Sequence, residues 1–144
     1  MNWLLAGLAM LGGVCVGLQA AINGQLGKKI GSLEGAFVSF AVGTLSLLLV
    51  MIFFGKGNVL SVMNLPKWQL TGGLLGAVYV VVSVLAVPKI GVATTLMAVV
   101  SGQLLMSAII DHYGLISGQQ IPFDWKRALA LILMAAALYL FTKR

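Results

Sequence analysis

Charged residues divide the chain so that five uncharged stretches are 15 residues or longer. The first runs from Met1 to Gly27, and the others cover 35–55, 68–88, 90–110 and 128–142. The middle three are 21 residues each, and at about 1.5 Å per residue such a helix spans a hydrocarbon core of about 30 Å. The pattern predicts one transmembrane domain over 1–144, with helices at about 3–26, 34–55, 68–88, 91–111 and 126–143.

Composition supports this fold class. Hydrophobic residues make up 60% of the chain and charged residues 8%, whereas a soluble domain carries about 25% charged residues. Five helices of about 20 residues use about 100 positions, which leaves short loops and no separate soluble domain. We therefore expect an all-α membrane protein that meets the lipid bilayer directly.

Lysine and arginine are nearly balanced between the two sides of the predicted bundle. With five spans, one side carries Lys56, Lys67, Lys126 and Arg127, and the other carries Lys28, Lys29, Lys89, Lys143 and Arg144. The cations are dispersed between apolar runs, which is typical of anchors at the headgroups and predicts no nucleic-acid partner. A four-to-five balance leaves orientation open under the positive-inside rule.

Two interpretations of this balance remain. Folding order could fix one orientation, or the chain could insert both ways so that two copies pair head to tail. We favour the second, because many transporters consist of two inverted halves and no repeat is visible within this sequence. The prediction is an antiparallel homodimer of ten helices.

Polar side chains recur at helical spacing inside the apolar segments. Gln19 and Asn23 share a stripe on the first helix, Tyr79 and Ser83 one on the third, and Gln103 begins one on the fourth. A primary amide has two N–H donors and an acceptor to satisfy. These five residues are candidate substrate-binding groups in a polar cavity, and the alternative is hydrogen bonding that holds helices together.

The candidates for gating or coupling are Glu34, Ser39, Asp111 and His112. Glu34 begins the second helix, where a carboxylate also favours the helix dipole. Asp111 and His112 end the fourth helix, as an interfacial pair or as a proton-responsive gate, since histidine changes charge near neutral pH. Asp124 is expected to cap the fifth helix.

The sequence holds no pattern for catalysis. No acid occupies the middle of a span, where proton-coupled pumps usually place one. It contains neither an HExxH motif nor a Walker loop, and its only cysteine and only histidine are Cys15 and His112. We expect no enzyme activity, no cofactor and no metal site.

Several motifs together resemble the YdcZ-type family of the drug/metabolite transporter superfamily. The resemblance covers nearly the whole chain and rests on Gly17-Leu-Gln19-Ala-Ala-Ile-Asn23, Ser39-Phe40 with Gly43-Thr44, Gly72-Gly73 with Gly76 and Tyr79-Val80, Pro88-Lys-Ile-Gly91, Gly102-Gln103 and Asp111-His-Tyr-Gly114. It implies a small bacterial inner-membrane transporter with five helices per unit, and a family that includes dual-topology single genes, paired genes and fused ten-helix forms.

One departure bears on the substrate. The distant small multidrug resistance relatives use a membrane-embedded glutamate on the first helix, where this chain has Gln19 and Asn23. The resemblance therefore argues against multidrug-cation antiport. We expect a transporter that moves a small neutral or zwitterionic polar metabolite by alternating access. The alternatives are a non-transporting membrane subunit and a dual-topology ion channel, and the antiparallel partner is either this chain or a paralogue.

Overall fold

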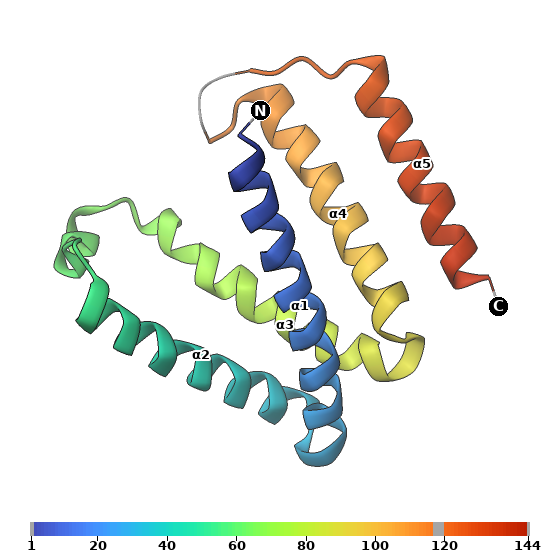
Figure 1. Cartoon of the computed structure of the whole chain (residues 1–144). Helices are drawn as coiled ribbons and strands as arrows, with labels where there is room; N and C mark the ends of the chain where they lie inside the picture. The colour runs from blue at the N-terminus through green and yellow to red at the C-terminus, as the bar shows by residue number, and fades with distance from the viewer. Residues whose placement is uncertain (1, 117–119, 144) are drawn as a thin grey trace. The chain divides into compact units, whose positions relative to one another are not determined.

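The computed structural model describes residues 2–116 and 120–143, which form five α-helices (Figure 1). These are α1 (Trp3–Ile30), α2 (Ser32–Phe54), α3 (Thr71–Ile90), α4 (Val92–Tyr113) and α5 (Trp125–Thr142). Two 3-10 turns, η1 (Val59–Asn64) and η2 (Lys67–Leu70), connect α2 to α3. The described residues contain no strand, and they include five helical segments long and apolar enough to cross a membrane. The all-α class and the five helices are confirmed.

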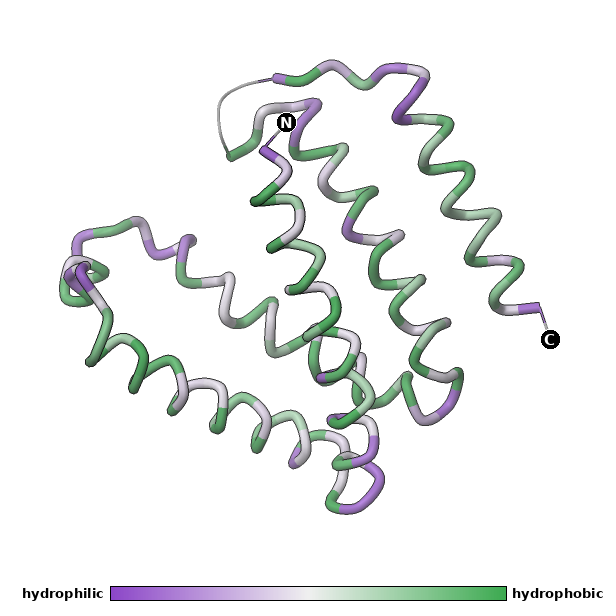
Figure 2. The backbone as a smooth tube through the Cα atoms, in the orientation of Figure 1, coloured by the Kyte–Doolittle hydropathy of each residue, from purple (hydrophilic) through white to green (hydrophobic). Residues whose placement is uncertain are grey.

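The chain divides into two compact units, which are described separately. The first contains α1, α2 and nearly all of α3, and the second contains α4 and α5. Figure 2 shows that hydrophilic positions gather near the helix ends and in the connections, while the helices are mostly apolar. Trp3, Trp68 and Trp125 are exposed at or just before the starts of α1, α3 and α5. Amphipathic aromatic rings are enriched at the interface between a bilayer and water, where the ends of these helices are expected to lie.

Three helices run beyond their predicted ends. The first continues through Lys28 and Lys29 to Ile30, because basic side chains in a last turn interact favourably with the helix dipole. Its 28 residues are about 42 Å long, so its lysine end can extend past the hydrocarbon core. The third helix continues through Pro88 to Ile90, and the fourth continues to Tyr113.

A single glycine separates α1 from α2, and a single glycine separates α3 from α4. Gly31 has φ 103° and ψ 148°, and Gly91 has φ 86° and ψ 161°. Only glycine adopts this backbone region readily, so it allows two long helices to meet through one residue. Both glycines follow the dipeptide Lys-Ile, and they lie sixty positions apart in the chain.

The same offset of sixty relates the buried faces of α1 and α3. On α1 the buried residues are Ala20, Asn23, Gly24 and Gly27, and on α3 they are Val80, Ser83, Val84 and Val87. Position 35 of α2 and position 95 of α4 are also both buried. Thus α1–α2 and α3–α4 share one local pattern of burial and glycine geometry, a structural repeat that is not visible as a repeat of sequence letters.

Contacts between α1 and α3 follow this repeat. A β-carbon on Gly24 would lie 2.6 Å from Cγ1 of Val87, and one on Gly27 would overlap Cγ1 of Val84. Moving either contact by sixty positions gives the other, which is the reciprocal relation that a two-fold axis produces. Glycine on α1 leaves room for the valine side chain on α3 at both contacts, so the contacting faces of the two helices are complementary in side-chain size.

The connection between α4 and α5 folds back onto the end of α4. Gly114 ends that helix in the left-handed conformation (φ 62°), and its N–H bonds to carbonyl oxygens of the last turn. The N–H of Ile121 donates to the carbonyl of Asp111 at 2.8 Å. Asp124 accepts a hydrogen bond from the N–H of Arg127 at 2.9 Å, which confirms the predicted cap of the fifth helix.

Candidate functional site

A hydrogen bond between two side chains joins α1 to α2. The amide nitrogen of Asn23 donates to Oγ of Ser39 at 2.9 Å. Asn23 is only 6% exposed, and Ser39 is half-buried. Two glycines near this bond allow the helices to approach closely, since a β-carbon on Gly35 would lie only 3.1 Å from Cα of Gly27. Small residues thus bring a binding candidate and a gating candidate into direct contact.

Ser83 and Tyr79 lie one turn apart on α3 in the same unit. Ser83 is 4% exposed, and its Oγ has no hydrogen-bond partner among the described residues. Tyr79 is partly buried and packs against the core cluster of Ala36, Val80 and Val84. Buried polar groups nearly always have a partner, so the unpaired hydroxyl of Ser83 is an exception that calls for a reason.

The two copies of the repeat differ at this polar pair. Sixty positions relate Asn23 to Ser83, and the same offset relates Ser39 to Val99. The position equivalent to Ser39 therefore carries an apolar side chain, which has no hydrogen-bonding group. One copy of the repeat holds a satisfied polar pair, and the other holds a lone buried hydroxyl.

Gln19 and Gln103 do not join these groups. Gln19 is one turn before Asn23 on α1, but its side chain is exposed while that of Asn23 is buried. Gln103 is exposed on α4, in the second unit. Both amides lie near the middle of long apolar helices, where lipid offers no hydrogen-bond partner.

The charged candidates lie at helix ends. Glu34 is exposed in the first turn of α2, where its carboxylate reaches back over Gly31. Asp111 accepts from a guanidinium nitrogen of Arg127 at 3.1 Å, and the two side chains are 40% and 35% exposed. The Nδ1 atom of His112 accepts from the N–H of Phe123 at 3.3 Å. Over residues 2–116 and 120–143, no group of three metal-binding side chains is present.

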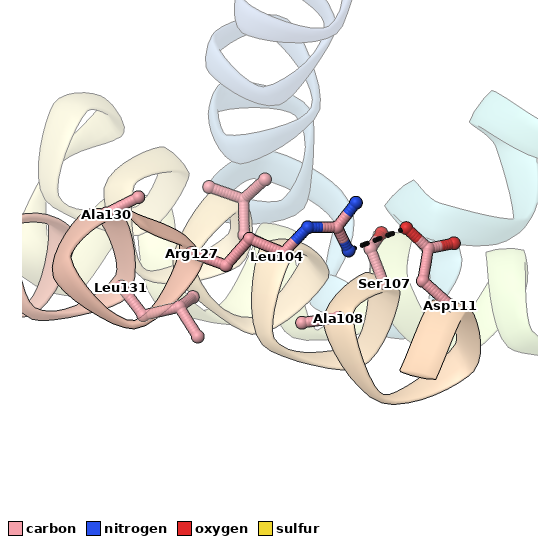
Figure 3. A pocket seen from close by; sticks show the side chains of 7 residues that line it. All are labelled: Leu104, Ser107, Ala108, Asp111, Arg127, Ala130 and Leu131. Atoms are coloured by element: carbon pink, nitrogen blue, oxygen red, sulfur yellow. Dashed lines mark hydrogen bonds and ion pairs between the residues drawn. The ribbon is translucent and has the colours of Figure 1, made fainter. Parts of the chain in front are cut away.

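A pocket of about 260 Å³ lies between α4 and α5. Figure 3 shows the ion pair of Asp111 and Arg127 beside Ser107. The remaining lining is apolar and consists of Leu104, Ala108, Ala130 and Leu131. The pocket thus combines one charged end with a hydrophobic body.

Sequence patterns found only part of this pocket. Ser107 and Asp111 belong to the polar stripe that continues from Gln103 along the fourth helix. The position of Arg127 beside Lys126, at the start of a span, predicts only an anchor at the membrane surface. The pairing depends on the return of α5 along α4, which spacing within one helix does not reveal.

One family model matches the chain, over residues 4–140, and its description is "Putative inner membrane exporter, YdcZ". No curated protein and no solved structure matches. The matched region covers all but the ends of the chain, and it confirms both the family and the multi-pass inner-membrane location that the motifs predicted.

Proposed function

The chain belongs to the YdcZ family of inner-membrane exporters, and we propose that it moves a small neutral or zwitterionic polar metabolite by alternating access. The observation that carries this proposal is a set of buried polar side chains inside apolar helices. Asn23 and Ser83 are buried, and Asn23 bonds to the half-buried Ser39, all within one unit whose core is otherwise small and apolar.

The chemistry of these groups favours an uncharged or internally balanced substrate. An amide offers two N–H donors and an acceptor, and the bond to Ser39 uses one donor of Asn23. The hydroxyl of Ser83 can donate and accept, and Tyr79 adds a phenol one turn away. These three residues carry no charge, so a lone cation would lose its hydration without an ionic partner.

Two glycines supply the hinges for the proposed rocking motion. Gly31 and Gly91 occupy equivalent places in the repeat, and each is the only residue between two long helices. Contacts of Gly24 and Gly27 with valines hold α1 and α3 together. We infer that α2 and α4 tilt about their glycines while the crossing of α1 and α3 stays packed. Hinges of this kind absorb a large backbone change at a few residues.

An antiparallel homodimer would cover the exposed amides. Gln19 and Gln103 would be costly against lipid, and a second copy can cover and satisfy them. The internal repeat does not replace that copy: one span separates α1 from α3, so both cross the membrane in the same direction. The balanced lysines allow the inverted orientation, and Gln19 and Gln103 then complete the binding site in the dimer.

Gating roles follow from the contacts of the four candidates. Ser39 would act as a gate between α1 and α2, because its bond to Asn23 must break when the helices part. Glu34 would couple transport to the Gly31 hinge, over which its carboxylate lies. Asp111 and His112 would hold the α4–α5 connection closed through Arg127 and Phe123.

Counterflow in proteoliposomes tests this function. Purified chain is reconstituted with a panel of unlabelled neutral and zwitterionic metabolites inside, and uptake of the labelled compound is measured. An exporter shows saturable exchange for at least one compound, and Asn23→Leu reduces it at least tenfold. Flux without exchange saturation would indicate the channel. No transport together with stoichiometric co-purification of another protein would indicate the non-transporting subunit.

A further inference from the structure

The pocket between α4 and α5 has a charged end and an apolar body, as a phospholipid has a charged head group and apolar acyl chains. Asp111 and Arg127 form its charged end, and Ser107 lies one turn before Asp111. The rest of the lining is aliphatic. A volume of about 260 Å³ is slightly below the range of about 300–1,000 Å³ typical of ligand pockets. It suits a head group and the first part of an acyl chain.

The charged end lies at the level expected for lipid headgroups. Asp111 is two residues before the last residue of α4, and Arg127 is two residues after the first residue of α5. Trp125, exposed at the start of α5, marks the same level. The apolar lining continues from there toward the middle of both helices, through Leu104 on one side and Leu131 on the other.

We propose that this pocket binds a zwitterionic aminophospholipid. The guanidinium of Arg127 receives the phosphate, the carboxylate of Asp111 receives the primary ammonium, and the acyl chain lies against the aliphatic lining. Arginine suits phosphate because its planar fork can donate two hydrogen bonds at once. The ion pair is over one-third exposed, and an exposed pair contributes little by itself, so opening it to a ligand costs little.

Charge complementarity selects this head group over the alternatives. The pair of Asp111 and Arg127 has no net charge and separates one positive from one negative group, as the zwitterion does. An anionic head group without an amine would meet the carboxylate unpaired. A trimethylated amine has no N–H to donate to Asp111 and is too bulky to approach it as closely.

The test uses the purified full chain in detergent and native mass spectrometry. Phosphatidylethanolamine, phosphatidylcholine and phosphatidylglycerol with identical acyl chains are titrated separately. Phosphatidylethanolamine should bind at least tenfold more tightly than either of the others. Arg127→Gln should remove this preference, and Asp111→Asn should bring phosphatidylglycerol up to the affinity of phosphatidylethanolamine. Lys126→Gln removes the same charge outside the pocket lining and should change nothing.

A second variant separates the pocket from the folding of the hairpin. Ala130→Phe fills the apolar body and leaves the ion pair in place, so it should weaken phosphatidylethanolamine binding at least tenfold at unchanged helical content by circular dichroism. Equal binding of the three lipids, or unchanged binding by Ala130→Phe, would overturn the proposal. So would equally tight binding of free phosphoethanolamine, which would indicate a site for a small soluble zwitterion.

Discussion

Gly27 on α1 lies directly against the side chain of Val84 on α3, with no room for a β-carbon between them. The reciprocal contact joins Gly24 to Val87. Close approach of helices through small residues is the usual way to gain packing energy in lipid, where the hydrophobic effect between helices is absent. The two contacts therefore set the crossing on which the polar groups of this unit depend.

A size swap tests this crossing. Gly27→Val forces two valines into one space and should destabilise the chain by about 1–3 kcal/mol, as overpacking does. The double variant Gly27→Val with Val84→Gly restores the total volume and should recover most of that loss. Thermal unfolding in detergent measures both. Equal losses in the single and double variants would show that the two positions do not pack together.

The glycines between the helices should respond alike to alanine. At Gly91 a β-carbon meets open space, so Gly91→Ala costs only backbone strain of about 1–3 kcal/mol. At Gly31 the β-carbon meets the carboxylate of Glu34, which ends a flexible and exposed side chain and can move away, so Gly31→Ala should cost about the same. Adding Glu34→Ala to Gly31→Ala should therefore change the loss little, measured by thermal unfolding. A large relief by Glu34→Ala would show that the carboxylate is fixed over this turn.

Orientation should respond to added charge. Two populations should be detected by a tag placed after residue 144, because the lysine and arginine balance is four to five. Adding three lysines to the connection between Lys56 and Lys67 should leave one population. The measurement is accessibility of the tag in inside-out and right-side-out vesicles. A tag on the original chain that is reached from one side only would refute dual topology.

Sequence reasoning found the five helices because hydropathy and the spacing of charges depend on the bilayer alone. The repeat escaped it, since complementary packing places glycine at 24 and 27 where the second copy has valine, and few positions besides Gly12-Gly13 and Lys29-Ile30-Gly31 carry the same residue sixty positions later. The hydrogen bond between Asn23 and Ser39 could not be predicted from the sequence either. Helical spacing shows which residues share a face of one helix, but not which residue of another helix they contact. Gln19 shares a predicted stripe with Asn23, yet the burial of α1 ends between them.

The buried hydroxyl of Ser83 separates a binding role from a structural one. If it serves only packing, Ser83→Ala should have little effect on transport. An unpaired buried polar group costs about 1–3 kcal/mol, so its removal should leave stability unchanged or raise it. If the hydroxyl binds substrate, the same variant should lose transport at least tenfold, which needs only about 1.4 kcal/mol of lost interaction in the transition state. We expect this second result, a chain that is at least as stable and much less active.

Ser46→Ala is the matched control, because Ser46 bonds to the carbonyl of Val42 in its own helix and should alter neither property. The measurements are counterflow per amount of folded protein and thermal unfolding. A Ser83→Ala chain that transports normally would remove Ser83 from the site, and one that unfolds readily would show that the hydroxyl holds the helices together.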